Sequence, residues 1–138
     1  MSPTEVLCFA GLVLFLVSLL GGAAIPRMKS PRLGLSAHVT GIEGGTFLIA
    51  VGLMWPRLTL SAMWSGVLAN GLWVSMDMLW LALLLAGVFG AGHGFGIAGQ
   101  GASTTPARQR LVTGLLVLGS LGILSAIAAV LLTWRWRG

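Results

Sequence analysis

Three ionisable side chains lie inside hydrophobic runs that are long enough to cross a lipid bilayer. His38 and Glu43 lie in residues 36–55, and Asp77 lies in residues 62–89. An ionisable group is costly in the bilayer interior, so each such residue is a candidate for function. A neutral imidazole is the commonest metal ligand in proteins, and a carboxylate can transfer protons. The sequence therefore predicts a chemical site within the membrane, centred on His38.

Glycines dominate the helix face on which His38 would lie. At about 100° per residue, Gly41, Gly45 and Gly52 share the face of His38, whereas Glu43 points about 140° away. Glycines at this spacing let a neighbouring helix approach closely. The same lack of side chains would let a flat macrocycle lie beneath a histidine ligand. Both interpretations stay open, and the second makes Gly41 and Gly45 candidate cofactor contacts.

A polar strip is predicted on the third hydrophobic run. Asn70 and Asp77 are seven positions apart and share a helix face, and Trp73 and Trp80 flank them at the same spacing. A hydrogen bond between helices would also explain such polar residues. Two membrane carboxylates are difficult to explain by packing alone, so we take Glu43, Asn70 and Asp77 as the candidate catalytic residues.

Basic residues cluster between the first two hydrophobic runs. Arg27, Lys29 and Arg32 fall within six positions, in a segment, residues 26–35, whose prolines discourage helix continuation. Such a loop sets membrane topology, or it forms a cradle for the anionic groups of a ligand just beneath it. His93 lies in the glycine-rich residues 90–106, which we expect to be an exposed, flexible loop, and His93 is expected to be exposed rather than a second ligand.

The composition places the chain in the membrane. Of its 138 residues, 57% are hydrophobic and 8% are charged, which excludes an ordinary soluble domain. The net charge is +5, but the basic residues lie at the edges of hydrophobic segments, where they contact lipid headgroups rather than nucleic acid. The single cysteine excludes an intrachain disulfide.

Four hydrophobic segments reach the length of about 20 residues that a transmembrane helix needs. We expect helices over residues 6–25, 36–55, 62–89 and 111–134, with Ser36 capping the second. The first segment lacks a preceding positive charge, which favours a retained helix over a signal peptide. A small-residue face for packing is formed by Gly119, Gly122, Ala126 and Ala129, and residues 134–137 would anchor the end at the interface. The predicted fold is an all-α integral membrane protein, a four-helix transmembrane bundle in a single domain, residues 1–138.

A single membrane histidine limits the kinds of metal site. Zinc is bound by three or four protein ligands, whereas haem needs one axial side chain. His38 as the metal ligand, a glycine groove, and Arg27, Lys29 and Arg32 for the propionates all suit haem b.

The second hydrophobic run also resembles a known family. Its motif consists of residues 33–38, Gly41, residues 45–48, residues 52–53 and residues 55–56. It resembles the hydroxylaminobenzene mutases and is more distantly similar to the styrene oxide isomerases, with the spacing from His38 to Pro56 as its strongest part. The resemblance implies a homotrimeric haem b enzyme of the bacterial inner membrane, with the histidine that matches His38 as axial ligand. It also implies a small aromatic substrate, an aryl hydroxylamine that is converted into an ortho-aminophenol without net redox change.

From the chemistry, we expect the iron to act as a Lewis acid on the N–O bond, and Glu43 or Asp77 to move the ring proton. The chain departs from the family pattern in two respects. Gly44 stands where the family favours asparagine, and the chain has no tyrosine, although the isomerase branch uses one on its third helix. Substrate contacts therefore do not transfer, and Asn70, Asp77 or Glu43 would supply the polar contact instead.

Three other functions remain open from the sequence. The chain could be a membrane anchor or packing subunit whose Glu43 and Asp77 pair with basic residues of a partner. It could be a small proton-coupled transporter that uses the same carboxylates. It could also isomerise an epoxide such as styrene oxide.

Overall fold

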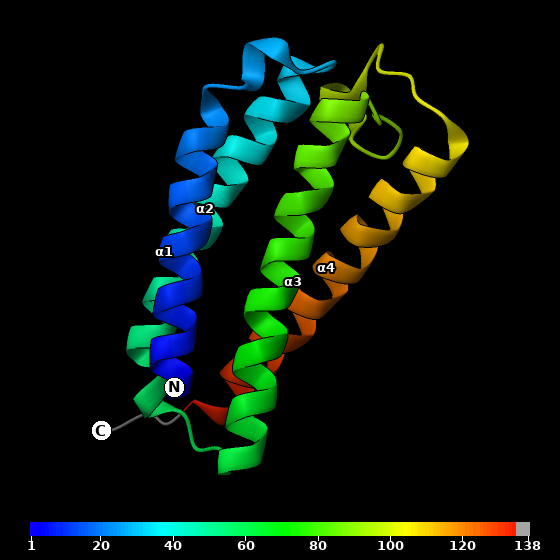
Figure 1. Ribbon diagram of the computed structural model, residues 1–138. Helices are drawn as coiled ribbons and strands as arrows, with labels where there is room; N and C mark the ends of the chain where they lie inside the picture. The colour runs from blue at the N-terminus through cyan, green and yellow to red at the C-terminus, as the bar shows by residue number, and fades with distance from the viewer. Residues whose placement is uncertain (135–138) are drawn as a thin grey trace.

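The computed structural model describes residues 1–134, and in this range it consists of four long helices (Figure 1). Three short 3-10 helices lie in the connections between them: η1 (Ile25–Arg27), η2 (Trp55–Arg57) and η3 (Gly96–Gly99). The helices are α1 (Pro3–Gly22), α2 (Pro31–Met54), α3 (Ala62–Phe89) and α4 (Pro106–Thr133). Each is long and apolar enough to cross a membrane. The predicted all-α class with four membrane-crossing helices is confirmed. Of the expected interfacial anchor, residues 135–137 lie outside the described part of the chain.

Two helices begin earlier than the sequence predicted, because their prolines lie in the first turn. Pro31 and Pro106 open α2 and α4, where a proline is tolerated since the first N–H groups of a helix have no partner within it. The expected starts at residues 36 and 111 are therefore wrong. Ser36 is not a cap but lies within α2, where its hydroxyl donates to the carbonyl of Arg32 at 3.1 Å.

The first helix also lies earlier in the chain than expected, at both ends. It starts at Pro3 because Ser2 and Glu5 form a capping box: the Ser2 hydroxyl accepts from the Glu5 N–H, and the Glu5 carboxylate accepts from the Ser2 N–H at 2.7 Å. It ends at Gly22 rather than at residue 25. This end of the helix lies beside the part of α2 that carries His38.

Helices α1 and α2 lie side by side (Figure 1) and approach closely through glycines on both of them. A Cβ atom added at Gly11 would lie 2.6 Å from the carbonyl oxygen of Gly45, and one added at Gly45 would lie 2.6 Å from that of Gly11. Further along, a Cβ atom at Gly52 would lie 3.0 Å from the Sγ of Cys8. Such close contact between backbones is possible only without side chains.

The buried core lies between α1, α2 and α3, and α4 packs against α3. The core side chains are apolar and include Leu7, Leu14, Leu48, Leu72 and Met76. On α4, Gly119 is buried, and a Cβ atom there would lie 2.7 Å from the Leu79 nitrogen of α3. The expected small-residue face of α4 is therefore the face that contacts α3.

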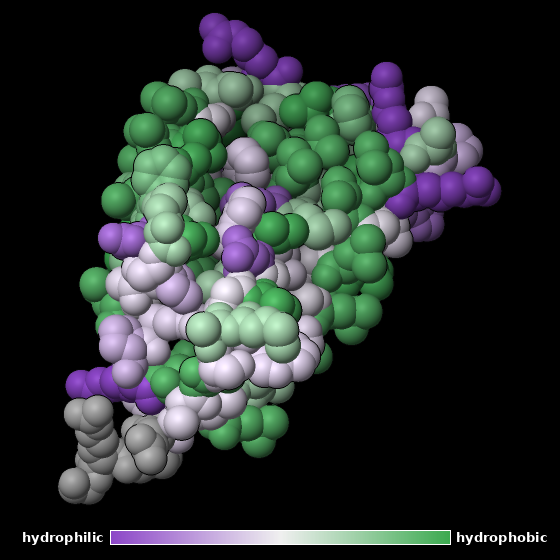
Figure 2. Space-filling model, turned by 60° about the horizontal axis from the view of Figure 1, so that its bottom comes forward, coloured by the Kyte–Doolittle hydropathy of each residue, from purple (hydrophilic) through white to green (hydrophobic). Residues whose placement is uncertain are grey.

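The outer surfaces of the helices are apolar, as a lipid environment requires. Figure 2 shows hydrophobic residues over much of both sides of the molecule, long hydrophilic side chains projecting at its edges, and a smaller group of hydrophilic atoms near the centre of the view. Exposed leucines on α1 and α4 include Leu12, Leu16, Leu20, Leu121, Leu124 and Leu131. In a membrane, these side chains face the hydrocarbon of the lipids.

The connection between α3 and α4 is more compact than the flexible loop expected from its glycines. Ala91 is fully buried, and the backbones of Gly92 and Gly99 touch. The ammonium group of Lys29 donates to the carbonyl of Ser103 at 2.8 Å, so it links this connection to the one between α1 and α2. His93 is exposed, as expected.

The contact between α1 and α2 can be tested at Gly11. Replacing Gly11 with Ala forces a methyl group against the backbone of α2, and overpacking of this kind costs about 1–3 kcal/mol. The midpoint of thermal unfolding in detergent should fall. Gly114→Ala is the matched control, because Gly114 is an exposed helical glycine with no atom within 4 Å of its added Cβ. An equal midpoint in the two variants would contradict the described packing.

Candidate functional site

His38 lies on α2, half-buried, with its imidazole against the end of α1. Its Nδ1 atom is 2.6 Å from the backbone carbonyl oxygen of Ser18. A carbonyl oxygen can only accept a hydrogen bond, so Nδ1 carries the proton. The other ring nitrogen, Nε2, then holds the lone pair that could bind a metal.

The space beside His38 within one chain is very small. The cavity there has a volume of about 10 Å³ and is lined in part by Ser18, Met28 and Trp80. A volume of this size holds at most one water molecule. A macrocycle bound to His38 would therefore have to lie outside the helix bundle of the single chain.

The glycine face below His38 is filled by α1. A Cβ atom at Gly41 would overlap the Ser18 hydroxyl and lie 2.7 Å from Cδ1 of Trp80, and one at Gly45 would lie 2.9 Å from Cβ of Phe15. Of the two interpretations of this face, the described chain shows the close helix contact. It offers no open groove at Gly41 or Gly45.

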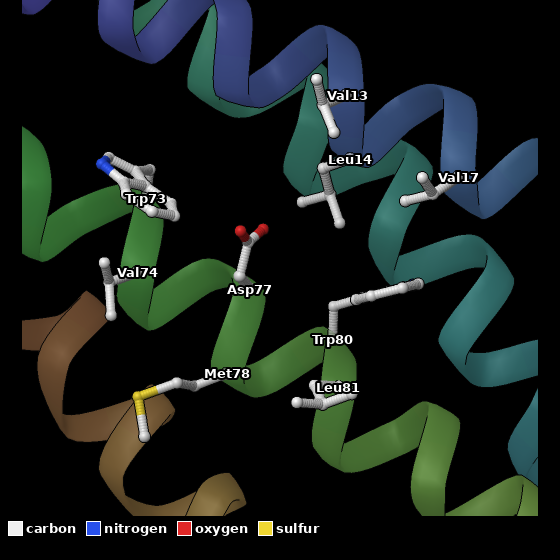
Figure 3. Close-up of a pocket in the computed structure, with 9 residues that line it drawn as sticks. All are labelled: Val13, Leu14, Val17, Trp73, Val74, Asp77, Met78, Trp80 and Leu81. Carbon is white, nitrogen blue, oxygen red and sulfur yellow. The ribbon is translucent and has the colours of Figure 1, made fainter.

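A much larger cavity lies between α1 and α3 (Figure 3), and Trp80 lines this cavity as well. It has a volume of about 490 Å³, and an adjoining cavity of about 280 Å³ shares Val13, Trp73 and Asp77 with it. Figure 3 shows the Asp77 carboxylate pointing from α3 toward α1, between Trp73 and Trp80. We call this space the Asp77 groove; its main cavity is lined by Val13, Leu14, Val17, Trp73, Val74, Asp77, Met78, Trp80 and Leu81.

Within residues 1–134, one oxygen of the Asp77 carboxylate has no hydrogen-bond partner. This Oδ1 atom is buried and accepts no hydrogen bond from any residue of the described range. A buried acceptor without a donor costs free energy, and nearly all buried polar groups in native proteins are paired. The arrangement therefore indicates a ligand or a partner that brings a donor into the groove.

Asn70 does not join Asp77, although the two share a helix face. Its amide donates to the Gly66 carbonyl at 2.8 Å, and its oxygen accepts from the indole N–H of Trp73 at 3.0 Å. Asn70 is exposed and lines neither part of the Asp77 groove. Groups on its own helix thus satisfy the Asn70 amide outside the groove, whereas Trp73 and Trp80 line the groove around Asp77.

Glu43 lies away from both spaces. It is exposed on α2 and lines neither the Asp77 groove nor the cavity beside His38. The two membrane carboxylates that the sequence singled out are therefore not brought together in the described chain. Any role for Glu43 would involve a molecule that contacts the outer face of α2.

The three basic residues near His38 are all exposed, at one end of the bundle. Lys29 is held by the Ser103 carbonyl, while Arg27 and Arg32 project at the surface. Within residues 1–134, no group of three or more His, Cys, Asp or Glu side chains lies close enough together to hold a metal ion. His38 is therefore a candidate for the single axial ligand of a cofactor and not for a multi-ligand metal cluster.

Sequence reasoning missed Ser18 and the position of Trp80. Ser18 is the only hydroxyl residue in residues 6–25, a signal that it has a particular place. Trp80 lines the Asp77 groove and also the cavity beside His38. The two candidate sites therefore share Trp80 as a lining residue.

Comparison with known proteins gives the family of the chain. The family model described as styrene oxide isomerase matches residues 4–135. The chain is 40% identical to hydroxylaminobenzene mutase HabB of Ectopseudomonas oleovorans over 128 residues, which are 92% of this chain and 77% of that protein. It is 38% identical to hydroxylaminobenzene mutase HabA of the same organism over 108 residues, which are 78% of this chain and 80% of that protein. No solved structure gives a significant match.

Because a buried oxygen of Asp77 has no partner within residues 1–134, we expect that removing this carboxylate will stabilise the protein. Replacing Asp77 with Leu removes a buried, unpaired oxygen from an apolar groove, so the free energy of unfolding should rise by about 1 kcal/mol. Asn70→Leu is the contrasting variant, and it should lower that energy because the indole of Trp73 loses its acceptor. Thermal unfolding in detergent measures both. A lower midpoint for Asp77→Leu would mean that Asp77 has a structural partner.

Proposed function

The chain belongs to the styrene oxide isomerase family, and on that basis we propose that it is a haem b-dependent membrane mutase acting on an aryl hydroxylamine. The product would be an ortho-aminophenol. The reaction class is supported by the likeness to a hydroxylaminobenzene mutase along 92% of the chain. The observation that supports haem as the cofactor is the contact of His38 with the Ser18 carbonyl.

His38 fits the role of an axial ligand. Metal-bound histidines usually donate their second N–H to a carbonyl or carboxylate, which fixes the tautomer and makes the ligating nitrogen more basic. The hydrogen bond to Ser18 supplies this arrangement and leaves Nε2 for the metal. Bound there, haem iron would supply a Lewis acid that polarises the N–O bond of the substrate.

The rest of the cofactor site would come from the surface of the chain. The cavity of about 10 Å³ beside His38 is too small for a macrocycle, so the cofactor would lie between this chain and another molecule. We propose that a neighbouring copy of the chain, in the homotrimer that the family resemblance implies, covers the site. Arg27 and Arg32 are exposed and would bind the propionates, whereas Lys29 already donates to Ser103.

The Asp77 groove suits an aromatic substrate. Its walls are almost entirely apolar, and Trp73 and Trp80 offer ring faces and edges for contact with a substrate ring. The unpaired carboxylate oxygen of Asp77 would accept the N–H or O–H of a hydroxylamine. Aromatic hydroxylamines are apolar enough to reach such a groove from the lipid.

One carboxyl group is sufficient for the proton transfers of this reaction. The hydroxyl oxygen leaves nitrogen and becomes bonded to the ortho ring carbon, that carbon loses a proton, and nitrogen gains one. Asp77 could take the proton from the ring carbon and return it to nitrogen, so that no electrons or protons are exchanged with the solvent. Glu43 is exposed on the other side of α2 and would act only at a contact with another copy.

The family match also supports a second candidate, the isomerisation of an epoxide such as styrene oxide. The same polarisation of a bond to oxygen would open the epoxide ring. Because the chain has no tyrosine, Asp77 would have to position that substrate as well. Assays with phenylhydroxylamine and styrene oxide in parallel separate the two candidates.

His38→Ala should abolish haem retention. The variant lacks the proposed axial ligand, so the haem-to-chain ratio of detergent-purified protein, measured as the pyridine haemochrome, should fall close to zero. His93→Ala is the matched control, because His93 is exposed in the connection between α3 and α4, and it should bind haem normally. Normal haem content in His38→Ala would refute the ligand assignment.

Asp77→Asn should slow turnover while leaving haem content unchanged. Loss of a general acid–base group typically lowers kcat by roughly 10²–10⁴-fold, and asparagine keeps the shape of the side chain. Ser125→Ala provides a control substitution of an intramembrane polar group on α4, outside the groove. If Asp77→Asn retained full turnover of phenylhydroxylamine under anaerobic conditions, Asp77 would have no part in the chemistry.

A further inference from the structure

We propose that the last turn of α1 positions His38, with Gly22 and the Ser18 carbonyl as its positioning residues. The two residues hold the imidazole in one tautomer and one orientation. The consequence for catalysis rests on the proposed function, in which His38 binds the iron. The geometry itself is independent of that function and can be tested separately.

Gly22 leaves the space in which the ring of His38 lies. A Cβ atom added at Gly22 would lie 2.8 Å from Cε1 and 2.9 Å from Nδ1 of His38. Any side chain at Gly22 would therefore displace the imidazole. The neighbouring Gly21 has no atom within 4 Å of its added Cβ. The need for glycine is thus specific to Gly22 and is not shared by the whole helix end.

The Ser18 carbonyl is held in place by close contact with α2. Ser18 is 1% exposed, and its side chain lies against Gly41, one helical turn from His38. A Cβ atom at Gly41 would lie 2.7 Å from Cβ of Ser18. Gly41 therefore lets α1 approach until the carbonyl oxygen is 2.6 Å from Nδ1 of His38.

The hydrogen bond to the Ser18 carbonyl has an electrostatic consequence for the imidazole. Donation of Nδ1–H to such a carbonyl makes the imidazole more electron-rich, so Nε2 becomes a stronger donor to a metal. A stronger donor favours ferric over ferrous iron. Loss of the contact should therefore raise the reduction potential of a bound haem.

The tautomer of His38 can be measured directly. The chain has two histidines, so ¹⁵N-histidine labelling gives few signals, and a His93→Gln variant assigns them. In the full-length, haem-free chain in detergent, His38 should carry its proton on Nδ1, with Nε2 unprotonated. Gly21→Ala should leave this pattern unchanged. Gly22→Ala should replace it with exchange between tautomers, in which the share protonated at Nε2 becomes the larger one.

Two results would overturn the proposal. The first is a wild-type His38 that carries its proton on Nε2, which needs no variant to observe. The second is the same spectrum for Gly21→Ala and Gly22→Ala. If Gly22→Ala does not fold, Gly41→Ala takes its place, because it pushes Ser18 away from α2 and should change the tautomer in the same way.

The haem-loaded protein separates this proposal from the proposed function. Gly22→Ala should raise the haem reduction potential relative to Gly21→Ala. A changed tautomer in Gly22→Ala together with unchanged haem content and potential would support the positioning role of α1, and it would overturn His38 as the axial ligand.

Discussion

The contact between α1 and α2 is the constraint on which the rest of the structure depends. Moving apolar side chains from lipid into a helix interface gains little free energy, because lipid is itself apolar. Helix association in a membrane therefore depends on close packing and hydrogen bonds. Here glycines on both helices permit that packing, and a Cβ atom at Gly11 or Gly45 would lie 2.6 Å from a backbone oxygen of the facing helix. The same approach brings the Ser18 carbonyl within 2.6 Å of His38. The packing of α1 on α2 therefore also determines the tautomer and orientation of the His38 imidazole.

Helix α1 also forms one side of the Asp77 groove, so the two halves of the candidate site share an element. One side of α1 meets the glycines of α2, while Val13 and Val17 face Asp77 across the groove (Figure 3). Trp80 lines both the groove and the cavity beside His38. The proposed ligand for iron and the proposed acceptor for an aromatic hydroxylamine therefore both adjoin one tryptophan.

Periodicity and hydrophobicity were sufficient to predict the broad architecture from the sequence. They gave the four membrane-crossing helices, the small-residue face of α4, and the flanking of Asp77 by Trp73 and Trp80. Boundaries were harder to predict, because a proline that ends one helix can equally open the next, as Pro31 does. The sequence could not decide between a helix contact and a macrocycle groove at Gly41 and Gly45, because both arrangements need residues without side chains at these positions.

Spacing in the sequence did not predict the hydrogen-bond partners of polar groups, because these partners depend on local geometry. Asn70 was placed with Asp77 by helical spacing, yet it is satisfied by Gly66 and Trp73 on its own helix. The partner of Lys29, the carbonyl of Ser103, depends on the folding of a distant connection. Such contacts can be identified only from the three-dimensional structure. The prediction that His38 and Asp77 are functional rests on a simpler argument, that an ionisable side chain costs free energy in a membrane.

We propose that this membrane isomerase depends on haem b for its activity. The measurement to make is the initial rate of ortho-aminophenol formation from phenylhydroxylamine, under anaerobic conditions, on preparations whose haem-to-chain ratio has been varied and counted as pyridine haemochrome. We expect a rate proportional to haem content and close to zero without haem. Full activity of the haem-free protein would contradict it.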